Sequence, residues 1–195
     1  MTARLTIPVW SPSIRICHWL LAALIGASWC TRHGGGTWHE YLGYGAAAVV
    51  ALRIALGMFG SGHARFAAFV VGPRALLSHL RTLRARHAAH FIGHNPAGGY
   101  MVLVLLAATA SVSATGWLYT TDRYWGVEWV ERLHACASDL LLLLILVHLC
   151  GVAFESWRGR ENLVTAMLHG HKRMPAHDPA HAETDIHPSL KETST

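Results

Sequence analysis

The segment LHACASDLLLLLILVHLCGV, residues 133–152, decides the fold of this chain. It is apolar over about the 20 residues that a helix needs to cross a bilayer, and its only charged residue is Asp139. It also contains His134 and His148, fourteen positions apart. At 3.6 residues per turn this spacing is about 1400°, roughly 40° short of four turns. Both histidines therefore lie on one face of a helix, about 21 Å apart along its axis.

The whole chain has the composition of a membrane protein. Its 195 residues are 52% hydrophobic and only 14% charged, whereas a soluble domain carries roughly 25% charged residues. This composition argues against a disordered chain, a disulfide-rich secreted module and an ordinary cytosolic enzyme. The net charge of +5 comes from arginines set between apolar runs, which is not the pattern of a nucleic-acid-binding face. The 15 histidines outnumber the 11 acidic residues, so we expect a small membrane protein that uses histidine as a ligand.

Hydropathy predicts an all-α membrane protein, a bundle of four transmembrane helices. The predicted spans are about Ile14–Trp29, Trp38–Phe59, Gly99–Tyr119 and Trp129–Trp157. Between the second and third spans, residues 72–91 predict a short amphipathic helix that either lies on the cytoplasmic leaflet or packs on the end of the bundle. We expect one transmembrane domain over residues 1–172 and a disordered, His-rich cytoplasmic tail over residues 173–195.

Positive charge predicts the orientation, because cytoplasmic loops carry an excess of Lys and Arg. One side of a four-span topology holds only Arg32, Arg123 and Arg132. The other side holds Arg4, Arg15, Arg65, Arg74, Arg81, Arg84, Arg86, Arg158, Arg160, Lys172 and Arg173. Both termini are therefore expected in the cytoplasm.

Four histidines fall inside the predicted spans, where ionisable groups are costly and point to function. By depth they form two pairs, His39 with His134 near the outer face and His18 with His148 near the inner face. Two imidazoles from facing helices can ligate a haem iron from both sides. Any one of them can instead be a hydrogen-bonded packing residue. A haem-free zinc or iron transporter would place carboxylates beside the histidines, and only Asp139 lies near midplane; we expect it protonated or paired inside the bundle.

Two arginines lie near the inner ends of the first two spans. Arg15 and Arg53 are candidates to pair with haem propionates, although extension of their side chains into the lipid headgroups explains them nearly as well. Cysteine spacing adds no alternative site, because the four cysteines form neither CxxC nor CxxCH. Thioredoxin-like chemistry and covalent haem c are therefore not expected.

Several segments of the chain together resemble one known family. They are VWSPSIRICHWLLA (9–22), WHEYLGYGAAAVVALRIALGMFGSGHARF (38–66), GPRALLSHL (72–80), GHNPAGGYMVL (93–103), residues 133–152 and RGRENLVTAMLHG (158–170). Over about residues 7–172 the chain resembles the bacterial cytochrome b561 and nickel–iron hydrogenase cytochrome b family of four-helix, two-haem membrane proteins. The resemblance implies that His18, His39, His134 and His148 are the axial ligands of two b-type haems.

The resemblance also implies electron exchange between a quinone and a redox protein on the outer face, such as a c-type cytochrome or a hydrogenase. His94, Asn95 and Gly98 match a turn that borders the quinone pocket in related proteins, although Asn95-Pro96 is equally expected as a turn that begins the third span. The sequence does not decide whether the chain is an enzyme in its own right, and a homodimer is compatible with it.

An alternative is a superoxide:quinone oxidoreductase that acts at the outer haem. This activity calls for a cationic funnel, and the outer loops are not cationic on balance. They carry Arg32, Arg123 and Arg132 against Glu40, Asp122, Glu128 and Glu131.

Overall fold

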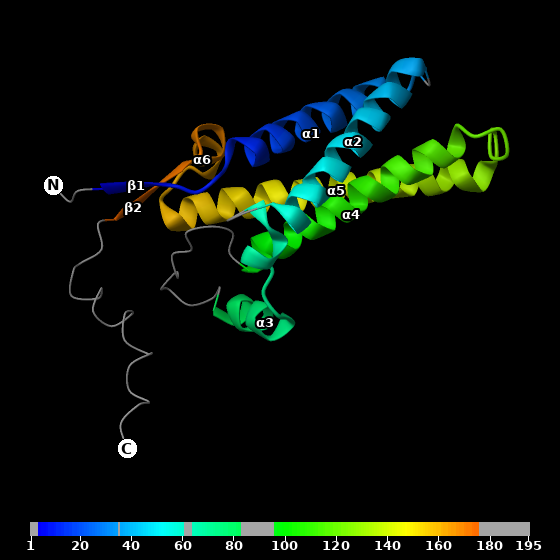
Figure 1. Cartoon of the computed structure of the whole chain (residues 1–195). Helices are drawn as coiled ribbons and strands as arrows, with labels where there is room; N and C mark the ends of the chain where they lie inside the picture. The colour runs from blue at the N-terminus through cyan, green and yellow to red at the C-terminus, as the bar shows by residue number, and fades with distance from the viewer. Residues whose placement is uncertain (1–3, 35, 61–63, 83–95, 176–195) are drawn as a thin grey trace.

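Four long helices dominate the structure, a computed structural model (Figure 1). It describes residues 4–34, 36–60, 64–82 and 96–175. The long helices are α1 (Pro12–Thr31), α2 (Thr37–Phe59), α4 (Pro96–Tyr119) and α5 (Glu128–Gly159). Each is long and apolar enough to cross a membrane. The four predicted spans are thereby confirmed, each within a few residues of its helix.

Smaller elements gather at one end of the bundle. They are β1 (Arg4–Pro8), a 3-10 turn η2 (Phe66–Ala68), α3 (Pro73–Thr82), α6 (Leu163–His169) and β2 (His171–Pro175). The strands β1 and β2 pair antiparallel, with Arg4 opposite Pro175 and Pro8 opposite His171. Both described ends of the chain therefore lie side by side (Figure 1). Hydropathy did not predict this small sheet, which includes residues 173–175 of the predicted tail.

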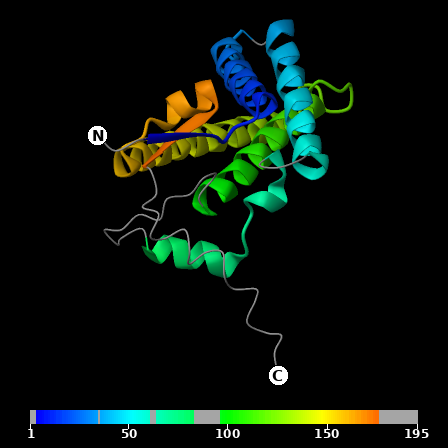
Figure 2. The same ribbon diagram turned by 60° about the vertical axis from the view of Figure 1, so that its left-hand side comes forward.

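The long helices pack as two pairs, and one helix of each pair also packs against one helix of the other pair. In Figure 2, α1 runs along α2, α4 runs along α5, and α2 also packs on α4. The helix pairs α1–α5 and α2–α5 make few backbone contacts in the described residues. The buried apolar side chains are Val9, Ile14, Cys17, Ala46, Val49, Val50, Phe69, Leu106, Val130, Leu141 and Ala166. Most other large apolar side chains of the four helices face outward, as expected where lipid is the solvent.

Local signals explain how the bundle closes at the end that carries β1 and β2. Proline at the first position of α1 begins that helix. The side chain of Asn162 accepts a hydrogen bond from the Thr165 amide at 3.0 Å and caps α6. That helix ends at Gly170, whose φ of 81° lies in the left-handed region that favours glycine. The Gly170 carbonyl then accepts hydrogen bonds from the amides of Val9 and Trp10, which joins the two ends of the chain.

The connection between α2 and α4 contains a helix near the predicted place. α3 begins at Pro73 and ends at Thr82, and the remainder of the predicted helix lies outside the described residues. Tyr100 on α4 donates a hydrogen bond from its hydroxyl to the Val71 carbonyl at 2.9 Å, which ties this connection to the bundle. Contact of α3 with a lipid leaflet remains a prediction.

Candidate functional site

Two histidines from different helices lie close together near one end of the bundle. The imidazole centroids of His39 on α2 and His134 on α5 are 6.1 Å apart, and the ring planes are nearly perpendicular at 89°. A metal–imidazole bond is about 2 Å long, so two rings that ligate one ion from opposite sides have centroids roughly 6 Å apart. The separation of His39 and His134 therefore fits a single metal ion, such as a haem iron, held between them.

Hydrogen bonds hold both rings in the same manner. Nδ1 of His39 lies 3.0 Å from the carbonyl oxygen of Ser28 on α1. Nδ1 of His134 lies 3.2 Å from the carbonyl oxygen of Val112 on α4 and 3.2 Å from the hydroxyl of Thr115. A carbonyl oxygen only accepts, so this network assigns the proton of each neutral ring to Nδ1. The lone pair of each ring is then on Nε2, the atom left to bind a metal.

A glycine lets the His134 ring lie against α4. A Cβ at Gly116 would be 3.1 Å from Cε1 of His134, tighter than ordinary carbon–carbon contact. Gly116 is one residue after Thr115, so one turn of α4 provides both the space for the ring and a hydrogen bond to it. The local sequence thus shapes a cradle for this imidazole.

The second pair lies on α1 and α5. His18 and His148 lie within range of an electrostatic interaction between their imidazoles. That the two rings hold one haem together stays a prediction. Nδ1 of His18 is buried, and no residue in the described part of the chain bonds to it. Buried polar atoms normally have a partner. This orphaned nitrogen therefore fits a place where a bound group completes the site.

Both histidine pairs bridge helices that do not pack closely. His39 and His134 join α2 to α5, and His18 and His148 join α1 to α5; these are the helix pairs with few backbone contacts. A flat cofactor held between two imidazoles needs such a separation of the backbones. The spacing of the helices fits two haem groups stacked along α5.

Arg53 is a buried cation on α2. It is fourteen residues after His39 on α2, so it shares the face of that helix which carries His39. Its side chain is only 7% exposed, and its guanidinium carbon lies 5.0 Å from the centroid of the Phe66 ring. Nη1 of Arg53 donates to the Ala64 carbonyl at 3.2 Å. Pairing of Arg53 with a haem propionate stays a prediction.

Arg15 has a structural partner. Its Nη1 donates to the Leu168 carbonyl of α6 at 3.1 Å, and a Cβ at Gly170 would be 2.7 Å from the same nitrogen. Arg15 thereby fastens α6 against α1. Its Nε is buried without a hydrogen-bond partner among the described residues. Pairing of Arg15 with a propionate stays a prediction.

The remaining predicted residues divide into three groups. His94 and Asn95 lie outside the described residues, and Gly98 lies in the first turn of α4, so the predicted quinone site stays a prediction.

Asp139 is exposed on the outside of α5; the expectation that it lies inside the bundle was wrong, because it points about 140° away from His134. Among the described residues, no three His, Cys, Asp or Glu side chains form a metal-binding cluster.

The comparison with protein families decides the family. The family model described as prokaryotic cytochrome b561 matches residues 9–170, which include all four long helices. The chain belongs to the prokaryotic cytochrome b561 family. Neither the comparison with curated proteins nor that with solved structures found a match. Membership of this family implies a multi-pass membrane protein that binds haem b and transfers electrons.

For this cytochrome b561, the sequence missed the groups that hold the outer histidines. The carbonyls of Ser28 and Val112 come from other helices, and a backbone carbonyl carries no sequence signal. Gly116 and Thr115 also escaped notice, because small residues are common in membrane helices for ordinary packing. One sequence signal could have found them: Thr115 and Gly116 are adjacent on the third span, which was expected to pack beside the span that carries the predicted ligand His134.

Proposed function

We propose that this cytochrome b561 carries electrons across the bacterial inner membrane through two haem b groups. His39 with His134 would hold one haem, and His18 with His148 would hold the other. The main support is the arrangement of His39 and His134, whose ring centroids lie 6.1 Å apart while a carbonyl oxygen holds each Nδ1. Haem b, when bound, supplies one-electron redox chemistry.

The protein itself orients the histidine rings, sets the distance between the two sites and keeps water from the space between them. The carbonyls of Ser28 and Val112 hold the outer rings in the tautomer that binds a metal. The fourteen-residue spacing of His134 and His148 sets the two sites about 21 Å apart along α5. Arg53 is a buried positive charge that would balance a propionate of a haem at the inner site. The apolar helices exclude water between the sites.

We further propose that the inner site exchanges electrons with the quinone pool. The quinone would bind beside His94, Asn95 and Gly98, with His94 as proton donor. The outer site would meet a periplasmic redox protein, either a c-type cytochrome or a hydrogenase-like protein. The arginine-rich segments support this orientation, because they adjoin the end of the bundle where β1 and β2 pair.

Direct oxidation of superoxide at the outer site is less well supported. Each arginine of the outer loops interacts with a neighbour: Arg132 forms an ion pair with Glu128, and Arg32 lies 3.7 Å from the Trp29 ring. Arg123 lies 5.5 Å from the ring of Tyr124. These groups do not form a cationic funnel, so we favour a protein partner.

Haem content after replacement of single ligands tests the proposal. His39→Ala and His134→Ala should each lose one of two haems per chain and leave the same b-type spectrum of the other. His18→Ala and His148→Ala should leave the complementary spectrum. Near two haems per chain in the outer variants would overturn the ligand assignment. Spectra recorded after addition of quinol, and then of ferric c-type cytochrome, test the two partners and the direction of electron flow.

A further inference from the structure

The outer surface of α5 carries a regular stripe of exposed residues, spaced alternately by three and four positions. We call it the α5 stripe; it consists of Cys136, Asp139, Leu143, Leu146, Cys150, Ala153 and Trp157. Leu143 is 56% exposed and Leu146 is 58% exposed. A repeat of 3.5 residues forms the seam of two helices that cross at a shallow angle, both in coiled coils and in membranes. The spacing therefore matches a helix–helix contact.

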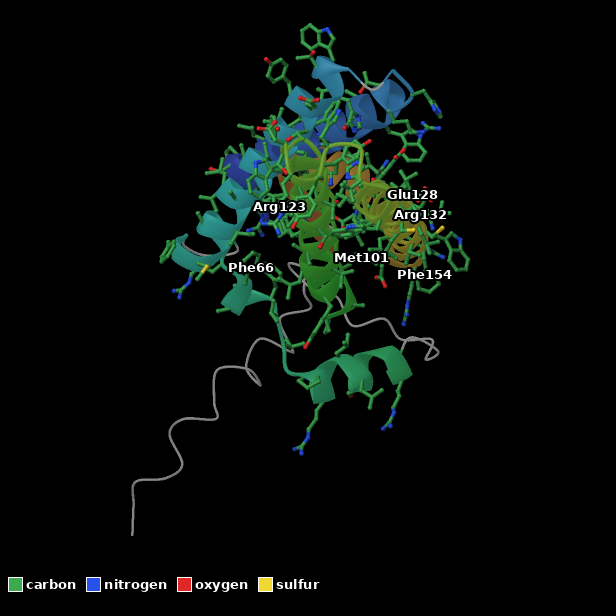
Figure 3. The ribbon with its side chains drawn as sticks, turned by 90° about the vertical axis from the view of Figure 1, so that its right-hand side faces the viewer. Phe66, Met101, Arg123, Glu128, Arg132 and Phe154 are labelled. Atoms are coloured by element: carbon green, nitrogen blue, oxygen red, sulfur yellow. The ribbon has the colours of Figure 1, made fainter. Side chains whose placement is uncertain are left out.

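The stripe points away from both histidine pairs. Asp139 is five residues after His134 and nine before His148, which places it about 140° and 180° around the helix from them. Figure 3 shows Arg132 and Phe154, which flank the stripe, on the side of α5 away from α2. The residues of the stripe are exposed, so no other element in the described ranges covers this face.

Asp139 makes lipid an unfavourable neighbour for the stripe. It lies two positions from residue 141, the midpoint between His134 and His148, and thus close to the middle of the span. Carboxyl groups inside membranes almost always face the protein interior or water, or pair with another polar group. Asp139 is exposed, and no hydrogen bond or ion pair to it occurs within the described part of the chain. No described residue of this chain therefore supplies a polar partner for Asp139.

We propose that the α5 stripe packs against the same stripe of a second copy of this chain, in a parallel pair related by a two-fold axis along the membrane normal. In such a pair each position meets its counterpart at the same depth. Asp139 then lies beside the partner's Asp139, and the two carboxyls share a proton in a hydrogen bond out of contact with lipid. The stripe thus complements itself without any cation from another protein. Small Cys136 and Ala153 allow the backbones to approach closely.

The native cysteines provide a direct test in membranes. The full-length protein, with buried Cys17 retained, is prepared in three forms that each keep one exposed cysteine: Cys136, Cys150 or Cys30. The other two are changed to Ser in each form. Mild oxidation should link the Cys136 and Cys150 forms into disulfide-bonded dimers. The Cys30 form is the matched control, because Cys30 is exposed on α1 away from the stripe, and it should stay monomeric.

Three results would overturn the proposal. They are the absence of dimers in both stripe forms, equal dimer formation by the Cys30 form, and a cross-link to a different polypeptide only. The last result would assign the stripe to a partner helix with a complementary polar group. Two haems per chain in every form would show that the variants are folded.

Substitution of Asp139 tests its role in the contact. Asp139→Leu should raise the dimer dissociation constant roughly 3- to 20-fold, the range for a polar contact between membrane helices. Asp139→Asn should stay within a few-fold of the parent protein, because two amides can also hydrogen-bond to each other. Energy transfer between labelled copies in lipid vesicles measures both. An unchanged dissociation constant in Asp139→Leu would contradict the proposal that the carboxyls pair.

Discussion

The space beside His134 can be tested by adding a single methyl group. In Gly116→Ala the new Cβ would lie 3.1 Å from Cε1 and 3.4 Å from Nδ1 of the His134 ring. Packed carbon atoms lie about 3.5–4.0 Å apart, so the ring must move by roughly half an ångström. That shift acts on the ring that the Val112 carbonyl and the Thr115 hydroxyl hold at 3.2 Å.

The expected consequence is selective loss at the outer haem. Disturbing a group that orients a ligating histidine typically costs 10- to 100-fold in metal affinity. Gly116→Ala should therefore lower occupancy or shift the potential of one haem, and the larger Gly116→Leu should remove that haem. The helix itself gains about 0.5–1 kcal/mol when Ala replaces Gly. A loss of haem would thus not reflect a weakened helix.

Haem content and a redox titration of the purified protein measure this effect. Gly26→Ala is the matched control: Gly26 also lies within a membrane-spanning helix, and a Cβ there meets nothing within 4 Å. The control should keep two haems with unchanged potentials. Parental spectra and potentials in both Gly116→Ala and Gly116→Leu would refute the proposed cradle for His134.

Three further predictions concern the groups around the two sites. Thr115→Val removes one of the two hydrogen-bond partners of His134. Because the Val112 carbonyl remains, both haems should stay bound. A redox titration should show a smaller shift of the haem potential than in Gly116→Ala. Arg53→Gln removes a positive charge that favours the reduced inner haem, so its potential should fall by tens of millivolts; an unchanged inner potential, or a fall at the outer haem alone, would contradict the placement. In Gly170→Ala an alanine must adopt a φ of 81° with its Cβ against Arg15, which should lower the free energy of unfolding by about 1–3 kcal/mol. A lower thermal midpoint measures this loss. Gly72→Ala, whose Cβ meets nothing within 4 Å, should leave the midpoint unchanged.

Much of the architecture follows from local patterns. The four spans could be predicted because each is a continuous apolar segment of about the length that crosses a bilayer. The rotation and depth of His134 and His148 also follow from one helix, since a helix has a fixed rise and turn. Pairing His134 with His39 needed only the further assumption that spans run across the same bilayer.

Local sequence patterns did not predict the contacts between distant segments of the chain. The strands β1 and β2 join residues near the two ends of the chain, and neither strand has enough alternating apolar residues to be predicted alone. Asp139 was expected inside the bundle, although its angle from His134 already excluded the same face. Its exposure depends on which sides of α5 the neighbouring helices cover.

The sequence by itself determined that this chain spans a membrane four times and carries two histidines at each of two depths. Hydrophobic length and helical periodicity are properties of one segment at a time, so no neighbour is needed to read them. Only the tertiary structure decided that the Ser28 and Val112 carbonyls hold the outer rings, that Gly116 makes room for His134, and that Asp139 faces outward. Each depends on where a second helix lies, because every residue has a backbone carbonyl and no sequence pattern records which ring it meets.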